Sequence, residues 1–144
     1  MSLEDIERRL RDYAAGKALV ALYLFGSTAA GTDTRLSDVD VAVLLPEELP
    51  KKTDYLEFRL ELAAELSQLL RTDAVDLVIL NEAPPLLRHR AIIQGKLIYS
   101  GDDIARVRFE VRTLQEYLDV KPLLNLQTRR LRERLREGSF GVRS

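Results

Sequence analysis

Apolar residues along the chain occur in two patterns: short unbroken runs, and longer stretches in which they recur every three or four positions. Short runs rich in Val, Leu and Ala are typical of buried strands, and we expect four, at about 19–25, 39–45, 75–80 and 96–99. Three-to-four spacing is typical of amphipathic helices, and we expect five, at 3–15, 54–70, 86–94, about 102–119 and 123–137. The pattern predicts an α/β (α+β) fold, in which helices pack on a small mixed sheet of about four strands.

Three residues are expected to mark helix ends. Ser2 is a suitable N-cap for the first helix, and Gly16 is expected to end it. Pro122 is expected to break or restart the C-terminal helix, because proline removes a backbone hydrogen bond from a helix interior.

The C-terminal helices carry an apolar seam and a basic end. The seam repeats at intervals of three and four residues, which predicts packing on another helix or on the sheet; it consists of Ile104, Val107, Val111, Leu114 and Leu118. Residues 127–144 hold six arginines and two glutamates, a net charge of +4, whereas residues 47–82 hold nine acidic and four basic residues, a net of −5. This asymmetry suggests a polar contact within the chain or between chains, with a solvated basic tail as the alternative.

Composition narrows the functional classes. A chain of 144 residues is expected to form one domain, with residues 1–101 as its main part and residues 102–144 as a C-terminal helical extension of it. The net charge of −1 gives no general affinity for polyanions, so no direct nucleic-acid binding is expected. There is no cysteine, and His89 is the only histidine, which excludes a disulfide framework and His-rich or thiolate metal sites. No signal peptide or membrane span is apparent, so we expect a cytoplasmic protein.

Candidate chemistry is concentrated between the first two expected strands. Asp38 and Asp40 stand at the mouth of the second strand and point the same way, with Val39 turned away between them. Two carboxylates so close repel each other unless they share a cation, and Mg²⁺ prefers oxygen ligands. Gly26 allows a close backbone approach to a ligand, and Ser27 can start a short helix whose N-terminus favours a phosphate.

These residues carry a resemblance to a known family. Gly26 and Ser27, ten further residues, and then Asp38, Val39 and Asp40 resemble the G-S-x10-D-x-D signature of the DNA polymerase β-like nucleotidyltransferases. The short chain and its tail look most like the minimal nucleotidyltransferases (MNT), the antitoxins of HEPN toxins. The signature covers residues 26–40, and a looser resemblance extends to about residue 122.

The resemblance implies a fold, a site and a reaction. It implies the polymerase β-like nucleotidyltransferase fold, with a third carboxylate on the neighbouring strand, where Asp76 fits. Asp38, Asp40 and Asp76 would hold two Mg²⁺ ions, and Gly26 and Ser27 would bind the phosphates of ATP. AMP would be transferred to a hydroxyl of a cognate HEPN toxin, with a tyrosine as the expected acceptor.

The sequence leaves the base preference, the exact function and the assembly open. Many members of the superfamily have an arginine soon after the first glycine, but this chain has Thr28-Ala29-Ala30-Gly31, which leaves its base preference open. Other possible functions are an antitoxin that acts by binding alone and a small-molecule transferase of the aminoglycoside-modifying type. No P-loop or dinucleotide-binding glycine motif is present. Both a homodimer and a hetero-oligomer with the toxin are open.

Overall fold

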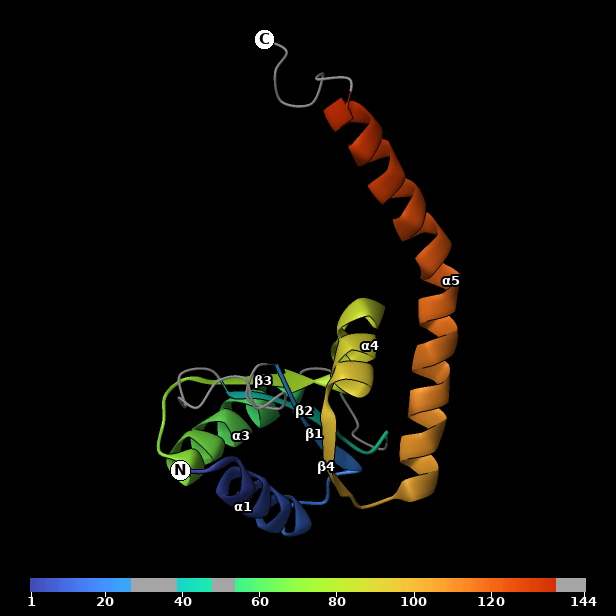
Figure 1. Ribbon diagram of the computed structural model, residues 1–144. Coiled ribbons are helices and arrows are strands. Elements are labelled where there is room, and N and C mark those ends of the chain that lie inside the picture. The colour runs from blue at the N-terminus through green and yellow to red at the C-terminus, as the bar shows by residue number, and fades with distance from the viewer. Residues whose placement is uncertain (27–38, 48–53, 137–144) are drawn as a thin grey trace.

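The computed structural model describes residues 1–26, 39–47 and 54–136, which form one four-stranded sheet with helices on both faces (Figure 1). The strands are β1 (Ala21–Phe25), β2 (Val39–Leu44), β3 (Val75–Ile79) and β4 (Lys96–Ser100), in the order β3-β2-β1-β4. β1 pairs antiparallel with β2 and with β4, whereas β2 and β3 are parallel. The prediction of a small mixed sheet is therefore confirmed.

The helices are α1 (Leu3–Ala15), α3 (Asp54–Leu70), α4 (Pro85–Gln94) and α5 (Asp103–Arg136), with a 3₁₀ turn at Leu80–Glu82. α1 has the predicted bounds and the predicted cap. The Ser2 Oγ atom accepts a hydrogen bond from the Asp5 backbone N–H at 3.2 Å, and the Asp5 carboxylate accepts one from the Ser2 backbone N–H. This reciprocal capping box satisfies backbone donors that a helix start would otherwise leave open.

Two apolar layers sandwich the sheet. On one face, α1 and α3 pack Ile6, Leu10 and Leu66 against side chains such as Val41. On the other face, α4 and α5 pack on a second cluster, which consists of Val20, Ala21, Tyr23, Phe25, Ala42, Leu44, Leu80, Ala91 and Phe109. The central strands are buried on both sides, because each face is covered by helices.

β3 differs from its prediction. The run at 75–80 was expected to be a buried strand, but β3 is an edge strand whose first four residues are half-buried or exposed. Among the described strands, β3 has a neighbouring strand only on the side of β2. Its apolar side chains are covered mainly by α3. The exposed residue in β3 is Asp76, which can meet solvent without the desolvation cost of a core position.

α5 is one helix of 34 residues, so the predicted break at Pro122 is wrong. Proline deprives only one carbonyl, that of residue 118, of its helical partner. Leu118 is 63% exposed, so water can satisfy that carbonyl and the helix can continue. Figure 1 shows α5 bending near its middle, close to where the proline lies, as expected of proline within a helix.

The seam of α5 does not face the sheet, which corrects one of its two predicted packings. Ile104, Val107 and Leu118 are exposed, whereas Phe109 and Thr113 turn inward and are buried. Contacts between α5 and the sheet decide which side of the helix faces inward. The three-to-four spacing of apolar residues in the sequence does not show these contacts.

A polar network holds α5 on the sheet. Tyr23 on β1 donates a hydrogen bond from its hydroxyl to the Glu110 Oε1 atom at 2.9 Å, and the Arg106 guanidinium donates to the same oxygen at 2.7 Å. Arg106 also donates to the Ser100 Oγ atom at the end of β4. Burial, and next to it the Glu110 carboxylate, raise the pKa of the Tyr23 hydroxyl well above its usual range. The hydroxyl therefore keeps its proton as a donor.

Among the described residues, several acidic groups between positions 47 and 82 pair with bases outside the arginine-rich end. Glu65 pairs with Lys17 at 2.8 Å, and Glu47 pairs with Arg112 of α5 at 3.4 Å. In the part of the chain that the structure describes, no helix has the length and apolar character needed to cross a membrane.

Candidate active site

Two of the predicted carboxylates meet at one end of the sheet. The parallel register of β2 and β3 places Asp40 directly beside Asp76. Side chains alternate faces along a strand, and Ala42 and Val78, two residues further on, belong to the layer under α4 and α5. Asp40 and Asp76 therefore project from the same face. Asp40 is half-buried and Asp76 is exposed, so the pair lies at the border between core and solvent.

Gly26 is fitted against this pair. It follows β1, whose last residue, Phe25, pairs with Asp40 across the antiparallel ladder. Its φ of +81° lies in the left-handed region that favours glycine. A Cβ atom on Gly26 would overlap the Asp40 Oδ2 atom and lie 3.1 Å from Asp40 Cγ. Glycine at this position brings the backbone near the Asp40 carboxylate, and the close approach to a ligand stays a prediction.

Gly95, between α4 and β4, contributes to the position of the site. A Cβ atom there would overlap the carbonyl oxygen of Ala91 and lie 3.2 Å from Phe25 Cβ. The close packing of the end of α4 against the end of β1 thus requires glycine, and it fixes the strand end that leads into Gly26. The only sequence signal for this role was a glycine between a helix and a strand.

Asp38 and Ser27 lie outside the described residues. The structure therefore brings together Gly26, Asp40 and Asp76 and says nothing of the other two. Among the residues it describes, no group of three or more His, Cys, Asp or Glu side chains could hold a metal ion. The described donors are two carboxylates on neighbouring strands, and hard divalent cations such as Mg²⁺ take oxygen ligands of this kind. Their chemistry fits such an ion.

His89 lies at the contact between α4 and α5. Its ring stacks on Tyr117 of α5, with 3.6 Å between centroids and 8° between planes. The neighbouring Arg88 donates to Glu116 at 3.1 Å and lies over the Phe109 ring. The structure therefore gives His89 a packing role between α4 and α5.

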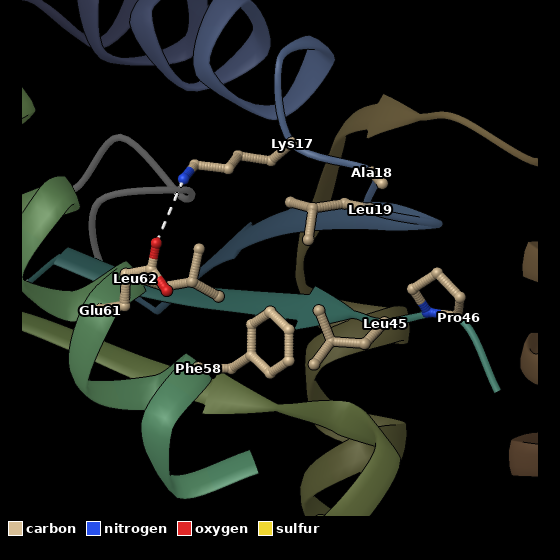
Figure 2. A pocket seen from close by; sticks show the side chains of 8 residues that line it. All are labelled: Lys17, Ala18, Leu19, Leu45, Pro46, Phe58, Glu61 and Leu62. Atoms are coloured by element: carbon tan, nitrogen blue, oxygen red, sulfur yellow. Dashed lines mark ion pairs between the residues drawn. The ribbon is translucent and has the colours of Figure 1, made fainter. Parts of the chain in front are cut away.

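Two cavities formed by the described residues lie at the opposite end of the sheet. Figure 2 shows the smaller, of about 150 Å³, with Leu19, Phe58 and Leu62 around it and Lys17 paired with Glu61 across its mouth. A larger one of about 730 Å³ is lined by residues that include Leu44, Asn81 and the start of α5. Gly26, Asp40 and Asp76 line neither cavity.

Comparison with known proteins agrees with this geometry. Residues 4–104 match the family described as polymerase beta, nucleotidyltransferase, and the chain belongs to that family. It is also 37% identical over 99 residues to the protein adenylyltransferase MntA of Shewanella oneidensis, an alignment that covers 69% of this chain and 66% of that protein. The resemblance to the minimal nucleotidyltransferases and the predicted fold are confirmed.

Solved structures resemble the chain over a greater length. A chain in the crystal structure described as the toxin–antitoxin with AMP-PNP superposes with a TM-score of 0.67 at 31% identity, covering 91% of this chain and 98% of that one. A chain in the complex of tri-AMPylated Shewanella oneidensis HEPN toxin with MNT antitoxin gives a TM-score of 0.66 at 27% identity, covering 90% and 98%. Because these matches extend past residue 104, they include much of α5.

Proposed function

We propose that this chain is a Mg²⁺-dependent protein adenylyltransferase that transfers AMP from ATP to a hydroxyl of a cognate HEPN toxin, with a tyrosine as the expected acceptor, and so acts as its antitoxin. The observation that carries the proposal is the in-register pair Asp40 and Asp76 beside a glycine whose backbone touches Asp40. The similarity to MntA and to complexes with AMP-PNP and with an AMPylated toxin supports the nucleotide and the partner.

The residues would divide the work as follows. Asp38, Asp40 and Asp76 would hold two Mg²⁺ ions, which when bound neutralise charge on the phosphates and on the attacking and leaving oxygens. Gly26 and Ser27 would bind the β- and γ-phosphates through backbone N–H groups and the serine hydroxyl. Asp76 is exposed at the edge of the sheet, where an acceptor on another protein can reach it.

The transfer itself forms one bond and breaks one. The acceptor oxygen attacks the α-phosphorus of ATP, and the bond from that phosphorus to the oxygen bridging to the β-phosphate breaks. AMP remains on the acceptor, and pyrophosphate leaves. The hydroxyl proton passes to the Asp76 carboxylate. Positioning of the two oxygens and electrostatic stabilisation would provide most of the acceleration.

The same proposal covers the arrangement of the chain and its compartment. The match over residues 4–104 supports residues 1–101 as the nucleotidyltransferase part and residues 102–144 as its helical extension. We place the protein in the cytoplasm, where ATP and a cytoplasmic toxin would meet it. A complex with the toxin is the assembly that the similar structures favour.

Transfer of label from α-labelled ATP tests the function. The chain is incubated with Mg²⁺ and the purified cognate toxin, beside Asp38→Asn, Asp40→Asn and the matched control Asp12→Asn, which changes an exposed aspartate on α1. We expect label on the toxin with the unaltered chain and the control, and none with the other two. A fully active Asp38→Asn variant would show that the two-metal assignment is wrong.

Two other outcomes would select the alternatives. Neutralisation of the toxin without label on any molecule would identify an antitoxin that works by binding alone. Label on a small hydroxylated compound but not on protein would identify a small-molecule transferase. Stabilisation by ATP with Mg²⁺ gives an independent check, since a ligand bound at 100 times its Kd raises the free energy of unfolding by about 2.7 kcal/mol.

A further inference from the structure

The second half of α5 stands clear of the sheet and of the other helices (Figure 1). We call residues 119–136 the projecting half. All of its residues are exposed except Val120 and Leu124, which are half-buried. Most of the stability of a protein helix comes from packing of one face, and short helices without such packing are marginal in water. Within the part of the chain that the structure describes, the projecting half has almost no such packing.

The projecting half continues the inward face of α5. In the first half, Phe109 and Thr113 turn toward the sheet and are buried. The same face continues at intervals of seven and four residues through Val120, Leu124, Leu131 and Leu135. At 100° per residue, these six side chains fall within roughly 80° of one another around the helix. The apolar stripe is therefore buried in the first half of α5 and continues, largely exposed, along the projecting half.

This stripe is distinct from the outer seam and is set among positive charges. Ile104, Val107 and Val111 of the seam point to the opposite side, away from the sheet. The remaining sides of the projecting half carry five arginines: Arg129, Arg130, Arg132, Arg134 and Arg136. Together with Glu133, these arginines give residues 123–136 a net charge of +4. A partner surface that covers the leucines would therefore bind more tightly if acidic groups surround its apolar centre.

We infer that the stripe on the projecting half is the docking surface for the protein that receives AMP, which would cover it with an apolar patch rimmed by carboxylates. The inference rests on the proposed function. The inward side of α5 is also the side of the sheet from which Asp40 and Asp76 project. A helix of 34 residues is roughly 50 Å long, so one globular partner can contact both its projecting half and the edge of the sheet.

Titration of the purified cognate toxin, without ATP or Mg²⁺, separates binding from transfer. The test variant is Leu131→Gln/Leu135→Gln, on the stripe. The matched control is Leu123→Gln/Leu126→Gln, which removes two exposed leucines from other sides of the same half. Glutamine keeps helix propensity close to that of leucine, and circular dichroism checks that both variants retain the helix.

We expect the stripe variant to bind the toxin at least 10-fold more weakly and the control to stay within twofold of the unaltered chain. Arg130→Glu/Arg132→Glu should also bind more weakly and show a shallower dependence on salt. The inference is overturned if the stripe variant binds as well as the control. Self-association through the leucines would also overturn the inference. Sedimentation of the chain alone would then show a dimer that the stripe variant loses and the control variant keeps.

These results are distinguishable from a failure of the proposed function. If the toxin is labelled at the normal rate and bound normally by the stripe variant, the docking surface is wrong while the transferase remains. If toxin binding depends on the stripe but no AMP is transferred, the docking surface stands and the activity is wrong.

Discussion

Asp40 and Asp76 are direct neighbours on the two parallel strands of an otherwise antiparallel sheet. They are 36 positions apart in the sequence, and the register between β2 and β3 alone brings them together. Like charges placed side by side on a sheet lower its stability by roughly 0.2–1 kcal/mol. Such an arrangement is useful where a cation is to be held.

Changing Asp76 should therefore affect stability and activity in opposite directions. Asp76→Asn removes one of two adjacent negative charges from an exposed position, so the metal-free protein should be as stable as before or more stable by up to about 1 kcal/mol. AMP transfer should fall by on the order of 100-fold or more, since the proposed general base and the proposed metal ligand would be lost together. Thermal unfolding with EDTA and label transfer with Mg²⁺ measure the two effects. Lower stability in EDTA would contradict this account of the pair.

Gly26→Ala should inactivate the site while leaving the fold in place. The left-handed backbone costs a residue with a Cβ about 1–2 kcal/mol, and the added atom would displace the Asp40 carboxylate. Misplacement by about 1 Å can cost on the order of 100-fold in rate. Gly16→Ala is the matched control, because φ at Gly16 is −87° and the nearest atom to an added Cβ is 3.6 Å away. Equal activity of the two variants would refute the role given to Gly26.

Tyr23→Phe should loosen the attachment of α5. The change leaves the ring in the core and removes one hydrogen bond to a charged group, a loss of about 1.5–3 kcal/mol. The pKa of the Tyr23 hydroxyl is raised in the folded protein, mainly by burial. Its stabilising effect is therefore complete below the unfolded pKa of about 10, and decreases as the pH rises above it.

Denaturant unfolding of Tyr23→Phe and the unaltered chain between pH 7 and 11 tests this linkage. Their difference in free energy of unfolding should shrink above about pH 10. Tyr13, whose pKa is also raised by burial and by Glu65, is present in both proteins and cancels in the comparison. A difference that grows with pH would have the wrong sign.

Pro122→Ala should straighten and stabilise α5. A proline inside a helix costs about 3 kcal/mol relative to alanine, and the substitution restores the backbone N–H group that the carbonyl of residue 118 lacks. Helical ellipticity at 222 nm should rise, and the melting of the projecting half should shift upward. No gain in helicity would indicate that the bend in α5 has another origin.

The sequence by itself determined most of the helices and strands and indicated the family. Apolar runs predicted the strands within about two residues, most clearly for β1 and β2, because strands covered on both faces exclude polar side chains. The spacing of Gly26, Ser27, Asp38 and Asp40 indicated the family, which the match over residues 4–104 confirms. Ser2 and Gly16 marked the ends of α1, because capping is a local interaction.

Tertiary structure decided what depends on contacts between distant parts of the chain. The order of the strands makes β3 an edge strand, on which Asp76 is exposed. The parallel register of β2 and β3 places Asp76 beside Asp40. Contacts with Tyr23 and α4 selected the inward face of α5, because two apolar stripes on one helix look equivalent in sequence. The helix passed through Pro122 because that turn is open to water, and exposure is a property of the folded molecule rather than of local sequence.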